Sequence, residues 1–178
     1  MRKDSIYFAF LFFSLFALVR PVFADYVLPY PSYMPGNKLY KISRILDVIE
    51  NYWHFGAIAQ TKYHLQLSDK YLVEAKTLFE YRQYLLGSDA LERSDMQFSS
   101  LQSQMNTVSK EGVDTLLLRT TIKDAAAKHV EVLQGLLDTT PETFNWTPEK
   151  TKATLLNIHA QIQSAIDLRN SVLNTLNN

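Results

Sequence analysis

The chain has 178 residues, of which 47% are hydrophobic and 20% are charged, and its formal net charge is zero. This composition is typical of a globular domain and excludes an intrinsically disordered chain. The neutral charge balance argues against a nucleic-acid-binding protein, because such proteins concentrate Lys and Arg. The chain contains no cysteine. It therefore cannot form disulfide bonds, and it is not expected to be a lipoprotein, whose lipid is attached to a cysteine.

The first 24 residues differ in character from the rest of the chain. Two basic residues precede an apolar run of 14 residues (6–19), and the small residue Ala24 follows a few positions later. This order is typical of a secretory signal peptide, so we predict cleavage between Ala24 and Asp25. The run is shorter than the roughly 20 residues that span a membrane, but an uncleaved membrane anchor stays open as an alternative. We expect a secreted or extracytoplasmic protein.

Residues 25–37 are rich in proline and tyrosine. Proline lacks an amide donor and disfavours helix at the residue before it, so an extended lead-in is predicted. Aromatic side chains among prolines are also suited to partner recognition. One candidate interaction strip consists of Tyr26, Tyr30, Tyr33 and, further along the chain, Trp53.

Residues 38–178 are predicted to form one domain of four to five long helices. The first begins with Asn37 as N-cap and ends before Gly56. Its apolar residues recur every three or four positions, which predicts a buried seam. This seam consists of Leu39, Ile42, Leu46, Ile49 and Trp53. The second helix, 57–86 and closed by Gly87, has two apolar stripes and is predicted to be the central helix. One stripe includes Leu65, Leu72, Ala75 and Phe79.

The remaining helices are predicted from similar signals. The third is capped at residues 88–89 and breaks near Gly112, and the fourth covers 113–138. After a loop, Thr147 is the expected N-cap and Pro148 the first residue of a fifth helix. No segment alternates strictly between apolar and polar residues, so no sheet is predicted. The predicted fold class is an all-α, up-and-down antiparallel helical bundle.

The first two predicted helices carry a family resemblance. The matching residues are Pro35, Gly36, Leu39, Tyr40, Ile42 and Arg44, and then Leu65, Leu67, Leu72, Glu74 and Ala75. They resemble a bacterial extracytoplasmic domain of unknown function, the family DUF5667, over about residues 26–142 and most closely over the 38–86 hairpin. The connection at residues 51–60 is more aromatic than is usual there. The resemblance implies a helical fold and an envelope location, and it implies no known reaction.

Candidate chemistry is sparse. The chain has four histidines, none three or four residues from another, and no glycine-rich phosphate loop. His129 and His159 lie on the last two long helices, where antiparallel pairing could bring them together, and they are the weak candidates for a metal site. Otherwise each is expected to be a partly exposed or capped helical histidine. We expect no catalytic residue and no cofactor.

Two functions stay open. The first is a non-enzymatic extracytoplasmic module that binds an envelope protein or itself. The alternative is a metal or small-ligand sensor, because helical bundles can hold ligands between facing helices. No nucleic acid is expected as a partner, and a membrane is expected only through an uncleaved N-terminal segment.

Overall fold

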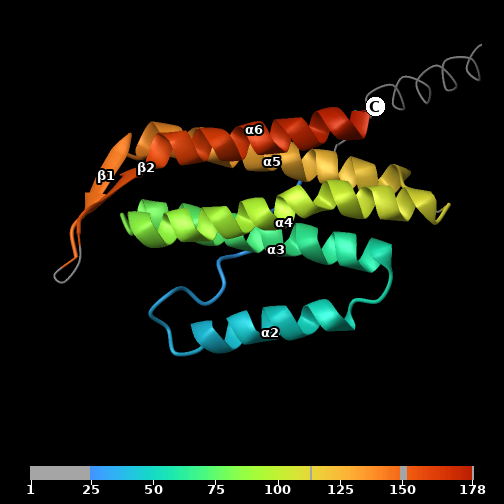
Figure 1. The fold of residues 1–178 in the computed structure, drawn as a ribbon, viewed down its shortest axis with the longest axis horizontal. Helices are drawn as coiled ribbons and strands as arrows, with labels where there is room; N and C mark the ends of the chain where they lie inside the picture. Colours follow the sequence, from blue (N-terminus) through green and yellow to red (C-terminus); the bar gives the residue numbers. More distant parts are fainter. Residues whose placement is uncertain (1–24, 113, 149–151, 178) are drawn as a thin grey trace, which may run out of the picture.

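The computed structural model describes residues 25–112, 114–148 and 152–177. Over these residues the chain forms helices α2 (Tyr40–Trp53), α3 (Ala57–Glu80), α4 (Tyr84–Lys110), α5 (Leu116–Thr139) and α6 (Ile158–Asn177), and strands β1 (Thr143–Trp146) and β2 (Thr154–Asn157) (Figure 1). The predicted all-α helical bundle is confirmed. The predicted signal peptide, residues 1–24, lies outside the described residues.

Helices α3 to α6 form a four-helix bundle with up-and-down order (Figure 1). Helix α3 packs against α4 and α5, and α6 packs against the same two helices. Helix α2 lies outside this bundle, alongside α3. No helix in the described part of the chain combines the length and the apolar character that crossing a membrane requires.

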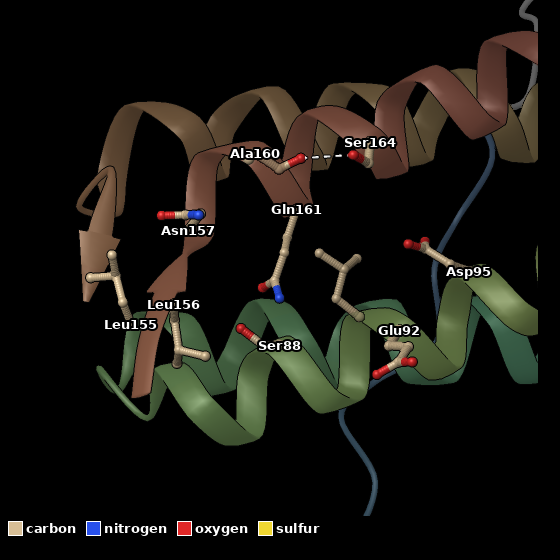
Figure 2. Close-up of a pocket in the computed structure, with 10 residues that line it drawn as sticks. Ser88, Glu92, Asp95, Leu155, Leu156, Asn157, Ala160, Gln161 and Ser164 are labelled. Carbon is tan, nitrogen blue, oxygen red and sulfur yellow. Dashed lines mark hydrogen bonds between the residues drawn. The ribbon is translucent and has the colours of Figure 1, made fainter. Parts of the chain in front are cut away.

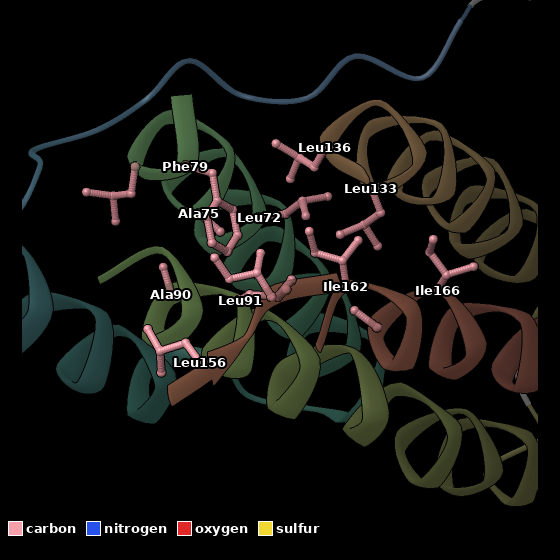
Figure 3. Close-up of a cluster of buried hydrophobic side chains, with 13 residues drawn as sticks. Leu72, Ala75, Phe79, Ala90, Leu91, Leu133, Leu136, Leu156, Ile162 and Ile166 are labelled. Carbon is pink, nitrogen blue, oxygen red and sulfur yellow. The ribbon is translucent and has the colours of Figure 1, made fainter. Parts of the chain in front are cut away.

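The interior of the bundle holds two apolar clusters. The hairpin-end cluster lies near the β-hairpin and includes Leu72, Ala75, Phe79, Leu91, Leu133 and Ile162 (Figure 3). The far-end cluster lies toward the opposite end of the bundle and includes Leu65, Phe98, Leu101, Met105, Ile122 and Val172. Each helix of the bundle contributes to both clusters, because its apolar positions recur every three or four residues along one face.

The predicted boundary between the second and third helices is wrong. Helix α3 ends at Glu80, six residues earlier than predicted, and the reversal occurs at Arg82, which adopts a left-handed φ of 58°. The amides of Arg82 and Gln83 donate to the carbonyls of the last helical turn, which closes the helix without a glycine. Gly87 instead lies inside α4. A Cβ there would come within 2.8 Å of Cδ1 of Phe79, so close packing requires the glycine.

The absence of a sheet was also predicted wrongly. Strands β1 and β2 pair antiparallel, with Phe144 opposite Leu156. Thr147 and Pro148 follow β1, and α6 begins only at Ile158, so they do not start a helix. Four-residue strands are too short to show a clear alternation. Tertiary packing stabilises them instead, because Phe144 and Leu156 cover the hairpin-end cluster.

Candidate functional site

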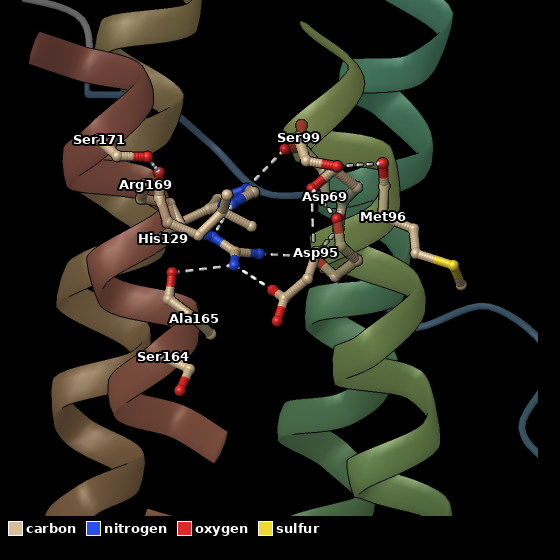
Figure 4. Close-up of polar contacts among 12 residues, drawn as sticks. Asp69, Asp95, Met96, Ser99, His129, Ser164, Ala165, Arg169 and Ser171 are labelled. Carbon is tan, nitrogen blue, oxygen red and sulfur yellow. Dashed lines mark hydrogen bonds and ion pairs between the residues drawn. The ribbon is translucent and has the colours of Figure 1, made fainter. Parts of the chain in front are cut away.

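A layer of polar side chains crosses the bundle between the two apolar clusters (Figure 4). In each helix these side chains occupy positions where the apolar spacing predicts a core residue. All of them are buried except Asp95, which is partly exposed. This polar layer consists of Ser68 and Asp69 of α3, Ser94 and Asp95 of α4, His129 of α5 and Arg169 of α6.

His129 lies at the centre of the polar layer, and both of its ring nitrogens have partners. Nε2 lies 2.7 Å from Oδ1 of Asp69, and Nε of Arg169 donates to Nδ1 over 3.5 Å. Because Nδ1 accepts a hydrogen bond, the hydrogen-bond network assigns the proton to Nε2, which donates to Asp69. The contacts therefore fit a neutral imidazole.

Arg169 joins α6 to α4. Its Nη1 pairs with Oδ1 of Asp95 and donates to the carbonyl of Ala165 at 3.0 Å, and its Nη2 donates to Oγ of Ser94 at 2.9 Å. The guanidinium also lies over the ring of Phe98, 5.1 Å from the centroid. The most deeply buried charge in the bundle is thus held by fixed partners on several sides.

Burial shifts the pKa values of ionisable groups in the polar layer. Burial lowers the pKa of His129, with Asp69 opposing that shift and Arg169 adding to it. Burial raises the pKa of Asp95, and the guanidinium of Arg169 opposes this shift. Arg169 pairs with Asp95, whereas Asp69 accepts hydrogen bonds from His129 and Tyr26.

Tyr26 connects the N-terminal lead-in to the polar layer. Its hydroxyl donates to Oδ2 of Asp69 at 2.6 Å, and its ring packs against the far-end cluster. Burial and the nearby carboxylate of Asp69 raise the pKa of the hydroxyl, which keeps it protonated as a donor. The segment after Asp25 is thus attached to the bundle interior.

The predicted interaction strip is not one surface. Tyr26 is half-buried in the contact just described, whereas Tyr30 and Tyr33 are 94% and 49% exposed along the lead-in. Trp53 is 72% exposed but lies at the far end of α2. Tyr26 is separated from the other members because its hydroxyl contacts a buried carboxylate, which sequence spacing within the lead-in could not reveal.

Helix α2 faces the bundle with its polar side. The carboxylate of Asp47 accepts hydrogen bonds from Nζ of Lys70 at 2.6 and 2.7 Å and from the hydroxyl of Tyr71 at 3.2 Å. Nearer the start of α2, the hydroxyl of Tyr40 donates to Oε1 of Glu74 in α3 at 2.8 Å. Arg93 of α4 donates to the same oxygen at 3.0 Å, so Glu74 is paired although it is buried.

The apolar side of α2 points away from the bundle, which contradicts the predicted buried seam. We call this surface the outward face. Its residues, with the exposed fraction of each, are Leu39 44%, Ile42 53%, Ile45 60%, Leu46 49%, Val48 61%, Ile49 41% and Trp53 72%, and it continues into Phe55 at 85%. One edge of this face, formed by Ile45, Val48 and Ile49, also lines a groove between α2 and the helices α3 and α4. Periodicity correctly indicated that these residues share a face, but it cannot indicate which way that face turns.

The turn before α2 contains two of the residues on which the family resemblance was based. Gly36 follows Pro35 and adopts a φ of 100°, which favours glycine. The side chain of Asn37 accepts a hydrogen bond from the amide of Leu39 at 2.9 Å, just ahead of the helix. These local contacts orient the start of α2.

The structure does not bring His129 and His159 together. His129 lies beside Arg169, whereas Nε2 of His159 lies 2.9 Å from the carbonyl of Thr140 near the hairpin. Ten residues of α6 separate the two levels, which corresponds to about 15 Å along the helix. Within the described residues, no group of three or more His, Cys, Asp or Glu side chains could hold a metal ion.

The expectation that His129 is partly exposed or capped is wrong, since it is fully buried. An Asp–His pair suggests acid–base catalysis, but a general base needs a free nitrogen within reach of its substrate. Here Nε2 contacts Asp69 and Nδ1 contacts Arg169, so neither nitrogen is free. In this arrangement the two contacts of His129 connect α5 to α3 and to α6.

Sequence reasoning missed the polar layer. Ser68 and Asp69 were considered only as mid-helix residues without a catalytic role, and Arg169 was not singled out, although both Asp69 and Arg169 interrupt an otherwise apolar face. In α3 the step from Leu65 to Leu72 passes over Asp69, and in α6 Arg169 lies between Ala165 and Val172. A charged residue in the same phase as the core positions of its helix was the available signal.

Comparison with known proteins identifies a family. A family model described as "Domain of unknown function (DUF5667)" matches residues 32–143, which include α2 to α5. Asp69, Asp95 and His129 lie within the match, and Arg169 lies beyond it. No curated protein and no solved structure matches the chain. Because the family model matches more than half of the chain, the chain belongs to the DUF5667 family.

Proposed function

We propose that this chain is a non-enzymatic helical module that acts outside the cytoplasm and binds a second copy of itself through the outward face of α2. The observation that carries the proposal is the orientation of α2. A helix normally buries its apolar side against its own domain. This one directs polar side chains to the bundle and leaves its apolar side exposed.

The size of the outward face supports a protein partner. Its side chains expose an area on the order of 1,000 Å², whereas the largest apolar patch of a typical monomer covers roughly 300–600 Å². Each partner in a stable interface of standard size contributes about 800 Å². The outward face alone is therefore large enough to form an interface.

The pattern of the outward face supports a second α2 as the occupant. Its central residues recur at spacings of three and four, the repeat by which two helices interlock. Without residues 1–24 the chain has 15 Lys and Arg against 17 Asp and Glu, a net charge of −2, so two copies repel each other only weakly through net charge. Two-fold dimers, in which one patch binds its own copy, are the commonest assemblies.

The other parts of the proposal have separate support. The engaged nitrogens of His129 argue against catalysis in the polar layer. The basic start, apolar run and small residue Ala24 in the first 24 residues support export from the cytoplasm. Cleavage after Ala24 would be checked by N-terminal sequencing of the exported protein.

Sedimentation velocity of matched full-length variants tests the pairing. Ile42→Asp combined with Ile49→Asp places charges on the outward face, and we expect it to shift the dimer toward monomer. Leu116→Asp combined with Leu117→Asp is the control, because these leucines are 71% and 77% exposed at the start of α5. Every variant retains the same N-terminal segment, so a difference between them reports on α2. Equal association of both variants would contradict the proposal.

The lack of cysteine allows a second test. Leu46→Cys places one thiol in the middle of the outward face, and Leu117→Cys places one elsewhere. A short bis-maleimide should link two copies of the first variant and leave the second unlinked. A monomeric chain that instead binds lipid vesicles or a different protein through α2 would overturn the choice of a second copy as partner.

A further inference from the structure

A polar pocket lies between α4, β2 and the start of α6, away from the outward face (Figure 2). Its volume is about 530 Å³, which is within the usual range for small-molecule sites. Helix α4 contributes Ser88, Leu91, Glu92 and Asp95, which share one face of that helix at spacings of three and four residues. Helix α6 contributes Gln161 and Ser164 from the opposite wall.

The pocket is electronegative. The residues that line it include Glu92 and Asp95 and no Lys, Arg or His. Asp95 is also the end of the polar layer, where Arg169 contacts its Oδ1. Among the described residues no hydrogen bond reaches Oδ2 of Asp95, and this partly exposed side chain lines the pocket. Glu92 and the free oxygen of Asp95 therefore offer acceptors to a cation that enters the pocket.

An unpaired polar atom lies in the same pocket. Ser88 is only 8% exposed, and its Oγ makes no hydrogen bond with the described residues. In Figure 2, Ser88 on α4 lies across the pocket from Gln161 on α6. Buried hydroxyl groups are nearly always hydrogen-bonded, so an unpaired one in the lining of a pocket indicates a missing polar partner. This observation is independent of the carboxylates.

We propose that this pocket binds a small aliphatic amine. The ammonium group binds between Glu92 and Asp95, where it pairs with the two carboxylates and donates up to three hydrogen bonds. The carbon chain lies against Leu91, Leu155 and Leu156, and a polar group at the other end reaches Ser88 and Gln161. A diamine or an amino alcohol of about five carbons has this combination of features.

The site does not depend on α2. No residue of α2 lines the pocket, so amine binding and self-association can succeed or fail separately. The test is isothermal titration calorimetry of the full-length chain with 1,5-diaminopentane and 5-aminopentan-1-ol. The neutral 1,5-pentanediol has similar length and lacks the charge. We expect both amines to bind and the diol to bind at least tenfold more weakly. Equal binding of the diol would overturn the assignment of a cation site.

Two variants locate the site. Glu92→Gln removes one carboxylate and is exposed enough to leave the fold intact. It should weaken binding of both amines about tenfold, because it removes one charge-assisted hydrogen bond. Glu111→Gln, an exposed change at the other end of α4, is the matched control and should leave binding unchanged. Ser88→Ala should weaken binding of the amino alcohol by a factor of several.

Amide chemical shifts provide a measurement that does not rely on affinity. Titration with 1,5-diaminopentane should shift the amides of α4 around Glu92 and those at the start of α6. Shifts confined to exposed acidic residues elsewhere, or an unchanged affinity in the Glu92→Gln variant, would show that the amine binds only as a diffuse counterion and would overturn the proposal.

Discussion

Helix α2 and the α3–α6 bundle carry the same kind of apolar repeat and use it in opposite ways. In the bundle the apolar side chains point inward, and charges in the interior are confined to a few residues with fixed partners. In α2 the polar residues Asp47 and Tyr40 form the inward contacts, and the apolar side is exposed. The repeat thus determines which residues share a face, whereas the polar partners on the neighbouring helix determine the direction of that face.

The largest expected loss of stability comes from breaking a polar contact inside the bundle, in contrast to the contacts of α2. Arg169→Ala leaves Asp95 and the acceptor nitrogen of His129 without their buried partner. Loss of one member of a buried ion pair should lower the free energy of unfolding by about 3–5 kcal/mol. Chemical denaturation measures this free energy of unfolding. The variant Lys62→Ala, at an exposed position, is the control. Ion pairs that are exposed to solvent contribute at most about 1 kcal/mol to stability. A loss smaller than this would therefore mean that solvent reaches the polar layer.

Two leucines compare the apolar contacts directly. Leu133 is 0% exposed and Leu46 is 49% exposed. Leu133→Ala should lower the free energy of unfolding by about 2–5 kcal/mol, because it leaves a cavity in the hairpin-end cluster. Leu46→Ala should change it by less than about 0.5 kcal/mol when measured at a concentration where the chain is monomeric. Equal losses would show that α2 buries its apolar side in solution and would remove the contrast.

Helix α2 should detach from the bundle without unfolding of the bundle itself. Asp47→Ala leaves Lys70 and the hydroxyl of Tyr71 without their acceptor, at an expected cost of about 1–2 kcal/mol. Hydrogen exchange of the α2 amides should accelerate, whereas exchange in α3 to α6 should change little. Uniform acceleration along the whole chain would mean that α2 and the bundle unfold as one unit.

The pH dependence gives the smallest effect. Burial holds the pKa of His129 below its ordinary value near 6.5. As the pH falls below that value, the unfolded chain takes up a proton that the folded chain does not, so stability falls. The slope for this one proton is at most about 1.4 kcal/mol per pH unit.

The variant His129→Gln isolates this contribution, because glutamine can donate to Asp69 and accept from Arg169 without titrating. Its stability between pH 7 and 5.5 should change less than that of the original chain. The measurement stops at pH 5.5 because Asp95 affects stability at more acidic pH. Its pKa is raised in the folded chain, so its protonation stabilises the folded state and opposes the effect of His129. Identical pH profiles would mean that folding leaves the pKa of His129 unchanged, which would contradict the lowering by burial.

Predictions from sequence succeeded for properties that depend on local spacing. Residues of α3 such as Leu72, Ala75 and Phe79 share the face that is buried, as their spacing predicted. The break near Gly112, with its φ of 72°, separates α4 from α5. The boundary at Arg82 was missed because its turn uses a left-handed non-glycine residue, and the β-hairpin was missed because long-range packing of Phe144 stabilises it.

The sequence by itself determined that this chain forms successive amphipathic helices and which side chains share each apolar face, because a helical repeat is a property of neighbouring residues. Only the tertiary structure decided that α2 turns its apolar face outward, that Tyr26 reaches Asp69, and that His129 and Arg169 meet in the interior. These outcomes depend on partners 23 or more residues apart, and the geometry of their hydrogen bonds exists only once the helices have packed.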